Sequence, residues 1–348
     1  MRAITIHQAK DLRIDSCEVE VPGADQVEIK LSAGGICGSD LHYYNHGGFG
    51  PIHLKEPMIL GHEVSGHITA LGGGGDGGEA GGLNVGDLVA VSPSRPCGYC
   101  TYCGEGRHNH CENMRFYGSA MPFPHIQGAF REVLIADASQ CVVANGLSAG
   151  EAAMAEPLSV VLHAARRAGD LLGKKVLITG CGPIGALAIL VARAAGAAQI
   201  VVTDLSPNAL DYAGRIGADQ AINMSTNADE LDIYAQGKGS FDVLFECSGA
   251  PQALAAGIAA TRPRGVVMQL GMGGDMSVPM LQITAKELDL RGSFRFHEEF
   301  ATAVALMQSG HIDVKPLISH TLPLDEAQAG FDLASDRNQA MKVQLSFA

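Results

Sequence analysis

The sequence KKVLITGCGPIGALAILVARAAGAAQIVVTD at residues 174–204 decides the fold. Residues 175–179 form a short apolar run rich in β-branched side chains, which predicts a strand buried on both faces. Gly180, Gly182 and Gly185 then supply G-x-G-x-x-G and lead into apolar residues at helical spacing. A second apolar run at 200–203 predicts the next strand, and Asp204 stands at its end.

Each part of this motif has a physical role in binding a dinucleotide. Gly180 permits the tight turn, Gly182 lets backbone N–H groups approach a pyrophosphate, and Gly185 allows helix and strand to pack closely. Asp204 can accept hydrogen bonds from ribose hydroxyls and would repel a 2′-phosphate, so we expect NAD rather than NADP. A glycine-rich turn in an ordinary α/β unit is the alternative. The predicted cofactor-binding residues are Gly180, Gly182, Pro183, Ile184, Gly185 and Asp204.

Length, charge and cysteine content limit the possible functions. A chain of 348 residues suggests two domains, and 47% hydrophobic residues are enough for substantial cores. A net charge of −13 argues against nucleic acid or an anionic membrane as a partner. We find no apolar run near the ~20 residues of a membrane span and no signal-peptide pattern, so we expect a cytoplasmic protein. Nine cysteines then indicate reduced thiols and metal binding rather than disulfides.

Around the dinucleotide motif, the pattern predicts an α/β protein with a β-rich first domain. Residues 72–82 are expected to be a glycine-rich surface loop. Ser148 and Glu151 form a capping box, and Glu156-Pro157 is expected to end or kink the helix that follows. Six strands would complete a parallel sheet, at 175–179, 200–203, 220–222, 241–246, 265–270 and 287–291.

The extent of the alternating strands and helices predicts the domain boundaries. These elements make up the dinucleotide-binding domain, which we place at residues 157–292. The β-rich domain is placed at 1–156. Residues 293–348 break the alternation, so this C-terminal segment is expected to return to the first domain.

Four cysteines within residues 97–111 have the spacing of a closed metal site. Four thiolates complete the tetrahedral shell of Zn²⁺, so this zinc would be structural. An iron–sulfur cluster is a rival, but the ferredoxin run has a shorter final gap and a proline where Glu112 stands. A redox C-x-x-C pair would leave two cysteines unexplained, and His108 and His110 are expected to be solvated. The predicted ligands are Cys97, Cys100, Cys103 and Cys111.

A second, catalytic metal site is predicted from Cys37, His62, Glu63 and Glu156, which lie beside glycine or proline. Catalytic Zn²⁺ needs about three protein ligands and an open position. Taken alone, a cysteine is more often a small buried hydrophobe, and a histidine a satisfied polar residue. Together, beside a nucleotide fold, they favour alcohol oxidation, because Zn²⁺ lowers the pKa of a hydroxyl and nicotinamide accepts hydride.

At these residues the chain resembles the zinc-dependent medium-chain alcohol and polyol dehydrogenases. GHEVSG matches the family's zinc signature, and CGSDLHY, the four-cysteine lobe and EPLSV match its sorbitol dehydrogenase branch. A closer resemblance is to the members of that branch that act on the sugar acid L-idonate. The segments that carry it are GGICGSDLHYY, MRFYGSAM, FPH and RGSFRF. The resemblance covers essentially the whole chain, apart from the insert at 72–82. It implies a GroES-like catalytic domain joined to a Rossmann domain.

The resemblance also implies which residues hold the catalytic zinc. Cys37 and His62 would be direct ligands. In alcohol dehydrogenases the third ligand is a cysteine at the position of Glu156. Polyol dehydrogenases instead use the glutamate after the histidine, here Glu63, and Glu156 would then hold the zinc-bound water. The sequence leaves both assignments open.

Substrate contacts follow from the same resemblance and from charge. A sugar acid brings a carboxylate, which a guanidinium suits. In the polyol branch the arginine at the Arg295 position lines the substrate cleft, and Arg115 and Phe116 are further candidates. A structural ion pair between Arg295 and Glu298 or Glu299 is the alternative. The residues expected to relay the proton or border the substrate are Ser39, His42 and Tyr43.

The function expected from these residues is the zinc- and NAD-dependent interconversion of a secondary alcohol with its ketone. The first expectation for the substrate is a sugar acid, with L-idonate giving 5-keto-D-gluconate. The alternatives are a sorbitol or xylitol dehydrogenase, a threonine-type dehydrogenase and a non-enzymatic nucleotide-binding relative. The last need not keep metal ligands, all of which are present here. By resemblance, we expect a homotetramer or a homodimer.

Overall fold

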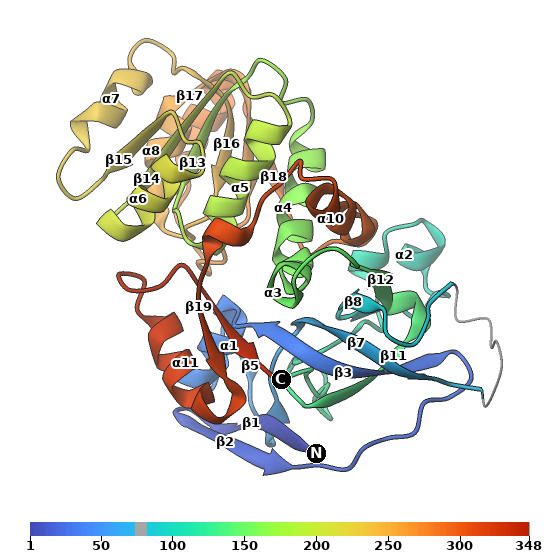
Figure 1. The fold of residues 1–348 in the computed structure, drawn as a ribbon. Coiled ribbons are helices and arrows are strands. Elements are labelled where there is room, and N and C mark those ends of the chain that lie inside the picture. Colours follow the sequence, from blue (N-terminus) through green and yellow to red (C-terminus); the bar gives the residue numbers. More distant parts are fainter. Residues whose placement is uncertain (74–81, 348) are drawn as a thin grey trace.

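The computed structural model describes residues 1–73 and 82–347 (Figure 1). A unit with a parallel sheet lies at the top of Figure 1, and a β-rich unit lies below it. The red C-terminal strands return to the lower unit. The predicted glycine-rich loop at 72–82 falls mostly on residues outside the described part.

The upper unit is a single parallel sheet with the strand order β15-β14-β13-β16-β17-β18. This order confirms the prediction of a six-stranded Rossmann sheet, and the reversal between β13 and β16 is where such sheets bind dinucleotides. The strands are β13 Lys175–Thr179, β14 Gln199–Asp204, β15 Gln220–Asn223, β16 Phe241–Glu246, β17 Thr261–Gln269 and β18 Asp289–Gly292. The helices are α5 Pro183–Ala194, α6 Pro207–Arg215, α7 Asp229–Ala235, α8 Pro251–Ala260 and α9 Met280–Lys286.

Strand β13 is buried on both faces, as its continuous apolar run predicts. Val176 and Ile178 belong to the core cluster that includes residues of α5. Leu177, which points to the opposite face, packs in the cluster with Leu254 and Ile258 of α8. Helices therefore cover both faces of the sheet. The carboxyl ends of the strands are left for a ligand.

The lower unit is built on a mostly antiparallel sheet with the order β12-β8-β7-β3-β20-β19, and β11 also pairs with β3. Its strands are β3 Gln26–Gly35, β7 Glu63–Leu71, β8 Leu88–Val91, β11 Val133–Asp137, β12 Cys141–Val143, β19 Ile318–Pro323 and β20 Lys342–Ser346. A second sheet contains β1 Arg2–Gln8, β2 Asp11–Ser16 and β6 Met58–Ile59. The remaining strands have two residues each and are β4 Gly48–Phe49, β5 Ile52–His53, β9 Ser94–Arg95 and β10 Arg115–Phe116.

The C-terminal segment contributes to both units. Helix α10 Glu299–Gln308 packs beside α4 Ala155–Ala168, and its apolar side chains join the core of the upper unit (Figure 1). Strand β20 pairs antiparallel with β3, and α11 Ala327–Ser335 packs on β20. The chain thus crosses between the units more than once, and the predicted domain limits at 156/157 and 292/293 stay predictions.

The capping box before the long helix is confirmed, but the predicted position of the break is wrong. Ser148 Oγ accepts the Glu151 N–H at 3.3 Å, and Glu151 Oε2 accepts the Ser148 N–H at 2.9 Å. Helix α3 Ala149–Ala153 ends at Met154, and Pro157 lies in the first turn of α4 rather than at a helix end. A proline is tolerated there because the first N–H groups of a helix have no intrahelical acceptor.

Candidate active site

Two segments bring three of the predicted metal ligands together. Cys37 is the N-cap of α1 Gly38–His46, and His62 and Glu63 lie at the start of β7. The pairing of β3 with β7 sets Gly35 opposite Glu63, which places the two segments side by side. Ligand atoms of Cys37, His62 and Glu63 all lie within 4.8 Å of one another.

Asp40 holds these two segments in place and was missed by the sequence analysis. It is fully buried, and its carboxylate accepts the Cys37 N–H at 3.0 Å and the Gly61 N–H at 3.2 Å. Its Oδ1 also lies 3.7 Å from His62 Nδ1. The local signal was present, because an acid three residues after Cys37 suits the first turn of a helix.

Lys342 is a second residue that the sequence analysis missed. Its side chain is 2% exposed, and its ammonium group forms an ion pair with Glu63, which is 1% exposed. It also donates to the Ile36 carbonyl at 3.0 Å. Burial lowers the pKa of Lys342, but the charges of Glu63, Cys37 and Glu156 together outweigh burial, so the net pKa is raised. A lysine in an apolar C-terminal strand carries no local sign of such a role.

The chemistry of this donor set fits a zinc ion. Burial and the charge of Glu63 raise the pKa of the Cys37 thiol to about 12, so a cation is needed to hold it as thiolate. In the described part of the chain, His62 Nδ1 is buried without a hydrogen-bond partner, and the buried Glu63 carboxylate is paired with Lys342. A thiolate, an imidazole and a carboxylate are ligands that zinc accepts.

Glu156 faces the same centre from the first turn of α4 but lies outside the compact three-ligand group. It is 6% exposed. Burial raises the pKa of Glu156 to about 8, and the negative charge of Glu63 acts in the same direction. The geometry therefore favours Glu63 as the third ligand, with Glu156 beside it.

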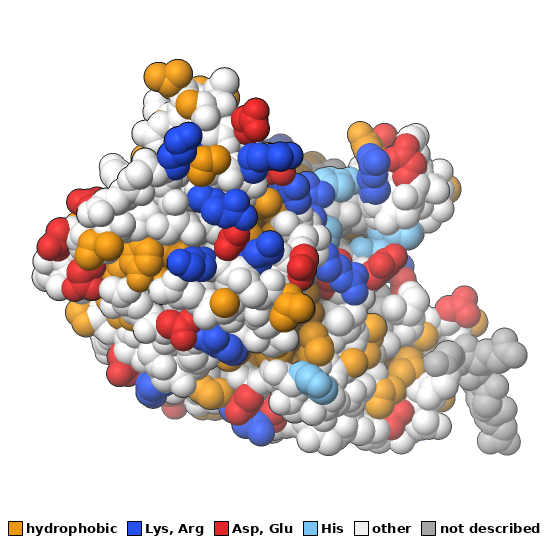
Figure 2. Space-filling model, turned by 90° about the horizontal axis from the view of Figure 1, so that it is seen from above, with side chains coloured by type: hydrophobic (Ala, Val, Ile, Leu, Met, Phe, Trp, Pro, Cys, Tyr) orange, Lys and Arg blue, Asp and Glu red, His pale blue; other side chains and the backbone are white. Residues whose placement is uncertain are grey.

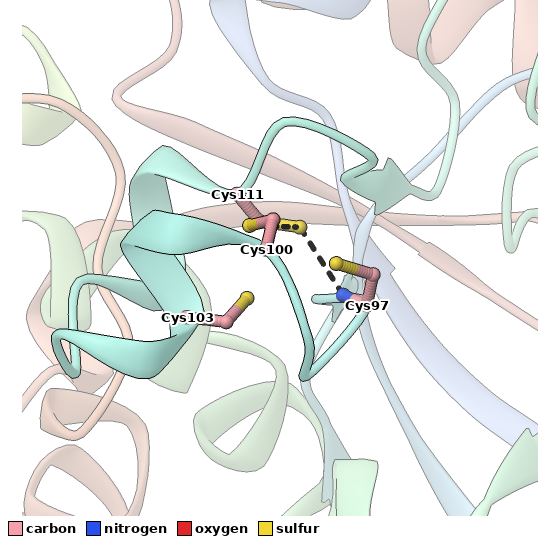
Figure 3. A group of neighbouring side chains, drawn as sticks. All are labelled: Cys97, Cys100, Cys103 and Cys111. Carbon is pink, nitrogen blue, oxygen red and sulfur yellow. Dashed lines mark hydrogen bonds between the residues drawn. The ribbon is translucent and has the colours of Figure 1, made fainter.

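The four-cysteine lobe is a separate site (Figure 3). Its helices are α2 Thr101–Gly104 and the 3₁₀ turn η1 His108–His110. The four sulfur atoms face one another, and the Cys97 N–H donates to Cys111 Sγ at 3.1 Å. All four sulfurs lie within 4.8 Å of one another, which fits a closed tetrahedral zinc shell.

The prediction that His108 and His110 are both solvated is wrong for His108. The His108 ring stacks on the His297 ring with centroids 3.9 Å apart, and its Nδ1 is buried. His110 is exposed, as predicted, although its ring lies 6.1 Å from Phe294. The cause is tertiary, because the segment after β18 folds against the lobe.

Arg295 and Phe116 lie together beside the metal ligands. The Phe116 ring centroid is 5.5 Å from that of His62, and the Arg295 guanidinium carbon is 4.3 Å from the Phe116 centroid. Burial lowers the pKa of Arg295, and the Glu156 carboxylate opposes this shift. No ion pair joins Arg295 to a carboxylate in the described part of the chain.

The alternative, an ion pair of Arg295 with Glu298 or Glu299, is wrong. Glu299 lies 3.2 Å from His163 and 3.1 Å from Arg166, and Glu298 lies 3.8 Å from the same arginine. Arg166 comes from α4, which the sequence could not place next to α10. Both acids are thus engaged away from Arg295.

Arg115 is not brought to the metal centre. It is exposed and lines a cavity beside the four-cysteine lobe, together with Tyr99 and Asp137. Successive strand residues point to opposite faces, so Phe116 faces His62 while Arg115 faces away. This placement leaves Arg295 as the arginine next to the ligands.

The predicted proton-relay and substrate-border residues lie on α1, which Cys37 caps. Tyr43 is 2% exposed, and its hydroxyl accepts the Ala120 N–H at 3.0 Å. Ser39 is half-buried, and His42 is exposed with burial and His46 lowering its pKa. Within the described residues, no hydrogen bond joins Ser39 to His42.

The predicted cofactor residues form the strand-to-helix turn after β13. Gly180 has a φ of +83°, and a Cβ on Gly185 would lie 1.9 Å from the Gly180 carbonyl oxygen, so both positions require glycine. Gly182 is the N-cap of α5, which begins with Pro183 and Ile184.

Asp204 organises the same turn. Its Oδ2 accepts the Cys181 N–H at 2.6 Å, and its Oδ1 accepts the Leu205 and Ser206 N–H groups at 2.7 and 2.8 Å. These bonds use three of the roughly four acceptor positions of a carboxylate. Asp204 can therefore still accept from a ligand hydroxyl, and it fixes the backbone that frames the site.

Comparison with known proteins decides the family. The model of the alcohol dehydrogenase GroES-like domain matches residues 23–146, and that of the zinc-binding dehydrogenase domain matches residues 183–309. The chain is 45% identical to L-idonate 5-dehydrogenase (NAD(P)(+)) of Escherichia coli, over 92% of this chain and 91% of that protein. The chain belongs to the zinc-dependent medium-chain dehydrogenases.

Other relatives agree with this family. Sorbitol dehydrogenase of Bos taurus is 36% identical over 99% of this chain and 95% of its own length. The crystal structure of the Escherichia coli L-idonate 5-dehydrogenase superposes with a TM-score of 0.93 at 41% identity, covering 99% and 97% of the two chains. The protein is thus a zinc-dependent oxidoreductase of NAD(P)-linked type. Across residues 1–73 and 82–347, every helix is too short or too polar to cross a membrane.

Proposed function

We propose that this enzyme oxidises the secondary alcohol of a sugar acid, L-idonate, to 5-keto-D-gluconate with NAD. The observation that carries the proposal is the Arg295 guanidinium, which lies on Phe116 beside His62 and has no carboxylate partner in the described residues. A guanidinium in that position suits the carboxylate of an aldonate. The identity to a relative named for L-idonate supports the same substrate.

In this proposal the chain's own residues have distinct tasks. Cys37, His62 and Glu63 bind the catalytic zinc, and Asp40 holds the backbone of both ligand segments. A bound zinc ion supplies Lewis acidity to the substrate hydroxyl. Glu156, buried beside these ligands, would hold a water molecule on the metal.

The proton and the hydride leave by different routes. Ser39 and His42 on α1 would carry the hydroxyl proton outward, and the exposed His42 would release it to solvent. Because no hydrogen bond joins these two side chains in the described part of the chain, a bridging hydroxyl or water would have to complete the relay. Gly182 and the N-terminus of α5 would hold the cofactor through its pyrophosphate, and a bound nicotinamide would supply the hydride acceptor. Asp204 favours NAD because its charge opposes a 2′-phosphate and the exposed residue after it is Leu205.

A substrate panel tests the proposal. NADH absorbance should give the highest kcat/KM with L-idonate, ahead of sorbitol, xylitol and threonine, and NAD should outperform NADP. Bovine sorbitol dehydrogenase is a relative over the whole chain, so sorbitol is the second candidate. Sorbitol outperforming idonate would overturn the substrate assignment.

Arg295→Ala tests whether Arg295 binds the substrate carboxylate or only maintains the structure of the site. Charged hydrogen bonds worth about 1.5–3 kcal/mol correspond to a roughly ten- to 150-fold higher KM for L-idonate. Sorbitol, which has no carboxylate, should be affected much less. Arg115→Ala is the matched control, because Arg115 faces away from the ligands. An equal rise in KM for L-idonate and sorbitol would contradict the proposal that Arg295 binds the carboxylate.

We also propose that the protein is a homo-oligomer in which two copies meet at β18. This strand is the edge of the parallel sheet. Exposed apolar side chains lie on and near it, including Leu290 on the strand and Met280 and Leu281 on α9. An exposed apolar edge of this kind is suited to pair with another chain. Leu281→Asp should shift the mass measured by light scattering toward the monomer, and an unchanged mass would contradict this interface.

A further inference from the structure

We propose that the four-cysteine lobe positions Arg295 through Asn109 and so contributes to the choice of substrates that carry a carboxylate. The inference rests on the proposed role of Arg295. Asn109 acts through the Arg295 backbone and is therefore a positioning residue. The lobe would then serve substrate selection in addition to local folding.

Three consecutive residues of the lobe contact the segment that carries Arg295. His108 stacks on His297 at 3.9 Å between ring centroids, and the His110 ring lies 6.1 Å from Phe294. Between them, Asn109 Nδ2 donates a hydrogen bond of 3.0 Å to the Phe294 carbonyl. Seen from above, histidine side chains gather where the projecting lobe meets the rest of the molecule (Figure 2).

This contact acts directly on the Arg295 backbone. Asn109 is 8% exposed, so water competes little for its amide. The Phe294 carbonyl that it binds belongs to the peptide immediately before Arg295, which has a φ of +55°. The left-handed region is unfavourable for a residue other than glycine, and such a residue stays there only when its surroundings hold it. The Asn109 bond supplies part of that hold.

The Arg295 side chain depends on the backbone for its direction. Its guanidinium carbon lies 4.3 Å from the Phe116 centroid and 4.9 Å from the Phe294 centroid, and Nη2 donates to Met121 Sδ at 3.7 Å. Ring faces support the plane of a guanidinium, and the N–H groups that do not bond Met121 remain available to a ligand. Because no ion pair with a described carboxylate fixes these N–H groups, release of the Phe294 peptide would let the guanidinium leave the Phe116 ring.

The test is Asn109→Asp, which keeps the shape of the side chain but removes the donor. The matched control is Asn227→Asp, an exposed asparagine in the upper unit that bonds Glu230. We expect KM for L-idonate to rise about three- to tenfold, the range of one neutral hydrogen bond, while kcat and the KM for sorbitol change less than about twofold. When Asn109→Asp is added to Arg295→Ala, the KM for L-idonate should rise by less than about a further twofold.

Further measurements keep the outcomes distinct. The zinc content of Asn109→Asp should match that of the unmodified protein. If that variant does not fold its lobe, His297→Ala weakens the same contact from outside the lobe and should likewise raise KM for idonate more than KM for sorbitol. If Asn109→Asp raised KM equally for idonate and sorbitol, the positioning role would be overturned. The same holds if Asn109→Asp raised KM for idonate in Arg295→Ala as much as in the unmodified protein.

A failure of the proposed function has a different signature. If Arg295→Ala alone leaves KM for idonate unchanged, the substrate role of Arg295 fails. A crystal structure of Asn109→Asp then decides the positioning claim by itself. It is expected to show Arg295 leaving the left-handed region or the Phe116 ring, and an unmoved Arg295 would overturn the claim.

Discussion

Replacing Lys342 by methionine is expected to destabilise the protein strongly when zinc has been removed. The Lys342 ammonium is the cation in contact with Glu63, and both side chains are almost fully buried. Methionine has a similar length but leaves the carboxylate without a counter-charge. Breaking a buried ion pair by removing one partner costs about 3–5 kcal/mol.

The structure supports the upper part of that range. Lys342→Met also leaves the Ile36 carbonyl without the hydrogen bond of 3.0 Å that it accepts from Lys342. A cost of about 4–5 kcal/mol, at about 2–4 °C per kcal/mol, lowers the midpoint of thermal unfolding by roughly 8–20 °C. Lys315→Met is the matched control, because Lys315 is 67% exposed and lies 3.4 Å from Glu151. Such a surface pair contributes about 0–1 kcal/mol.

The assay is thermal unfolding followed by circular dichroism, on chelator-treated protein at fixed concentration. The double variant Glu63→Gln/Lys342→Met should recover much of the loss, since it removes both charges together. Zinc should also reduce the loss of stability in Lys342→Met, because the metal replaces the missing ammonium as the cation beside Glu63. A Lys342→Met protein as stable as Lys315→Met without metal would refute the reasoning.

Three further predictions concern pH, cofactor and metal. Burial raises the pKa of Glu299, but hydrogen bonds from His163 and from backbone N–H groups together outweigh burial and hold the pKa at about 2. The stability that Glu299 contributes should therefore be lost between pH 4.5 and 2. The free energy of unfolding of Glu299→Gln should fall less steeply over this range than that of the unmodified protein, and an equal slope would be evidence against the assignment. Asp204→Ala with a basic residue at 205 should shift preference toward NADP roughly ten- to a thousandfold, at about 1.4 kcal/mol per tenfold, in initial rates; equal use of NAD and NADP by the unmodified enzyme would contradict this. Metal analysis should find two zinc ions per chain, and Cys100→Ser should lose one and unfold at a lower temperature; full zinc content in that variant would exclude the lobe as the second site.

Much of the fold was predictable because its signals are local. The alternation of apolar runs and glycines from Lys174 to Asp204 specifies strand, turn and helix within a few residues of each other, and the structure has β13, α5 and β14 there. The capping box at Ser148 is equally local. The break in the next helix was misplaced because a proline is compatible with both a helix end and a first turn.

The metal sites were predictable in composition but only partly in arrangement. Four cysteines within residues 97–111 are close in any compact lobe, so their spacing alone indicates zinc. Cys37 and His62 lie far enough apart in sequence that only the pairing of β3 with β7 brings them together. The structure favours Glu63 over Glu156 because strand register, which no local pattern encodes, places Glu63 in the compact group.

The sequence by itself determined the Rossmann unit, the ligand types and the acid at the cofactor turn, because periodicity, glycine geometry and donor chemistry act over short stretches. The tertiary structure alone decided the partners of those residues. Asn109 and Phe294 are 185 positions apart, and a strand near the C-terminus brings Lys342 to Glu63. Contacts at such separations depend on sheet register and on how the lobes pack, and these result from burial summed over the whole chain.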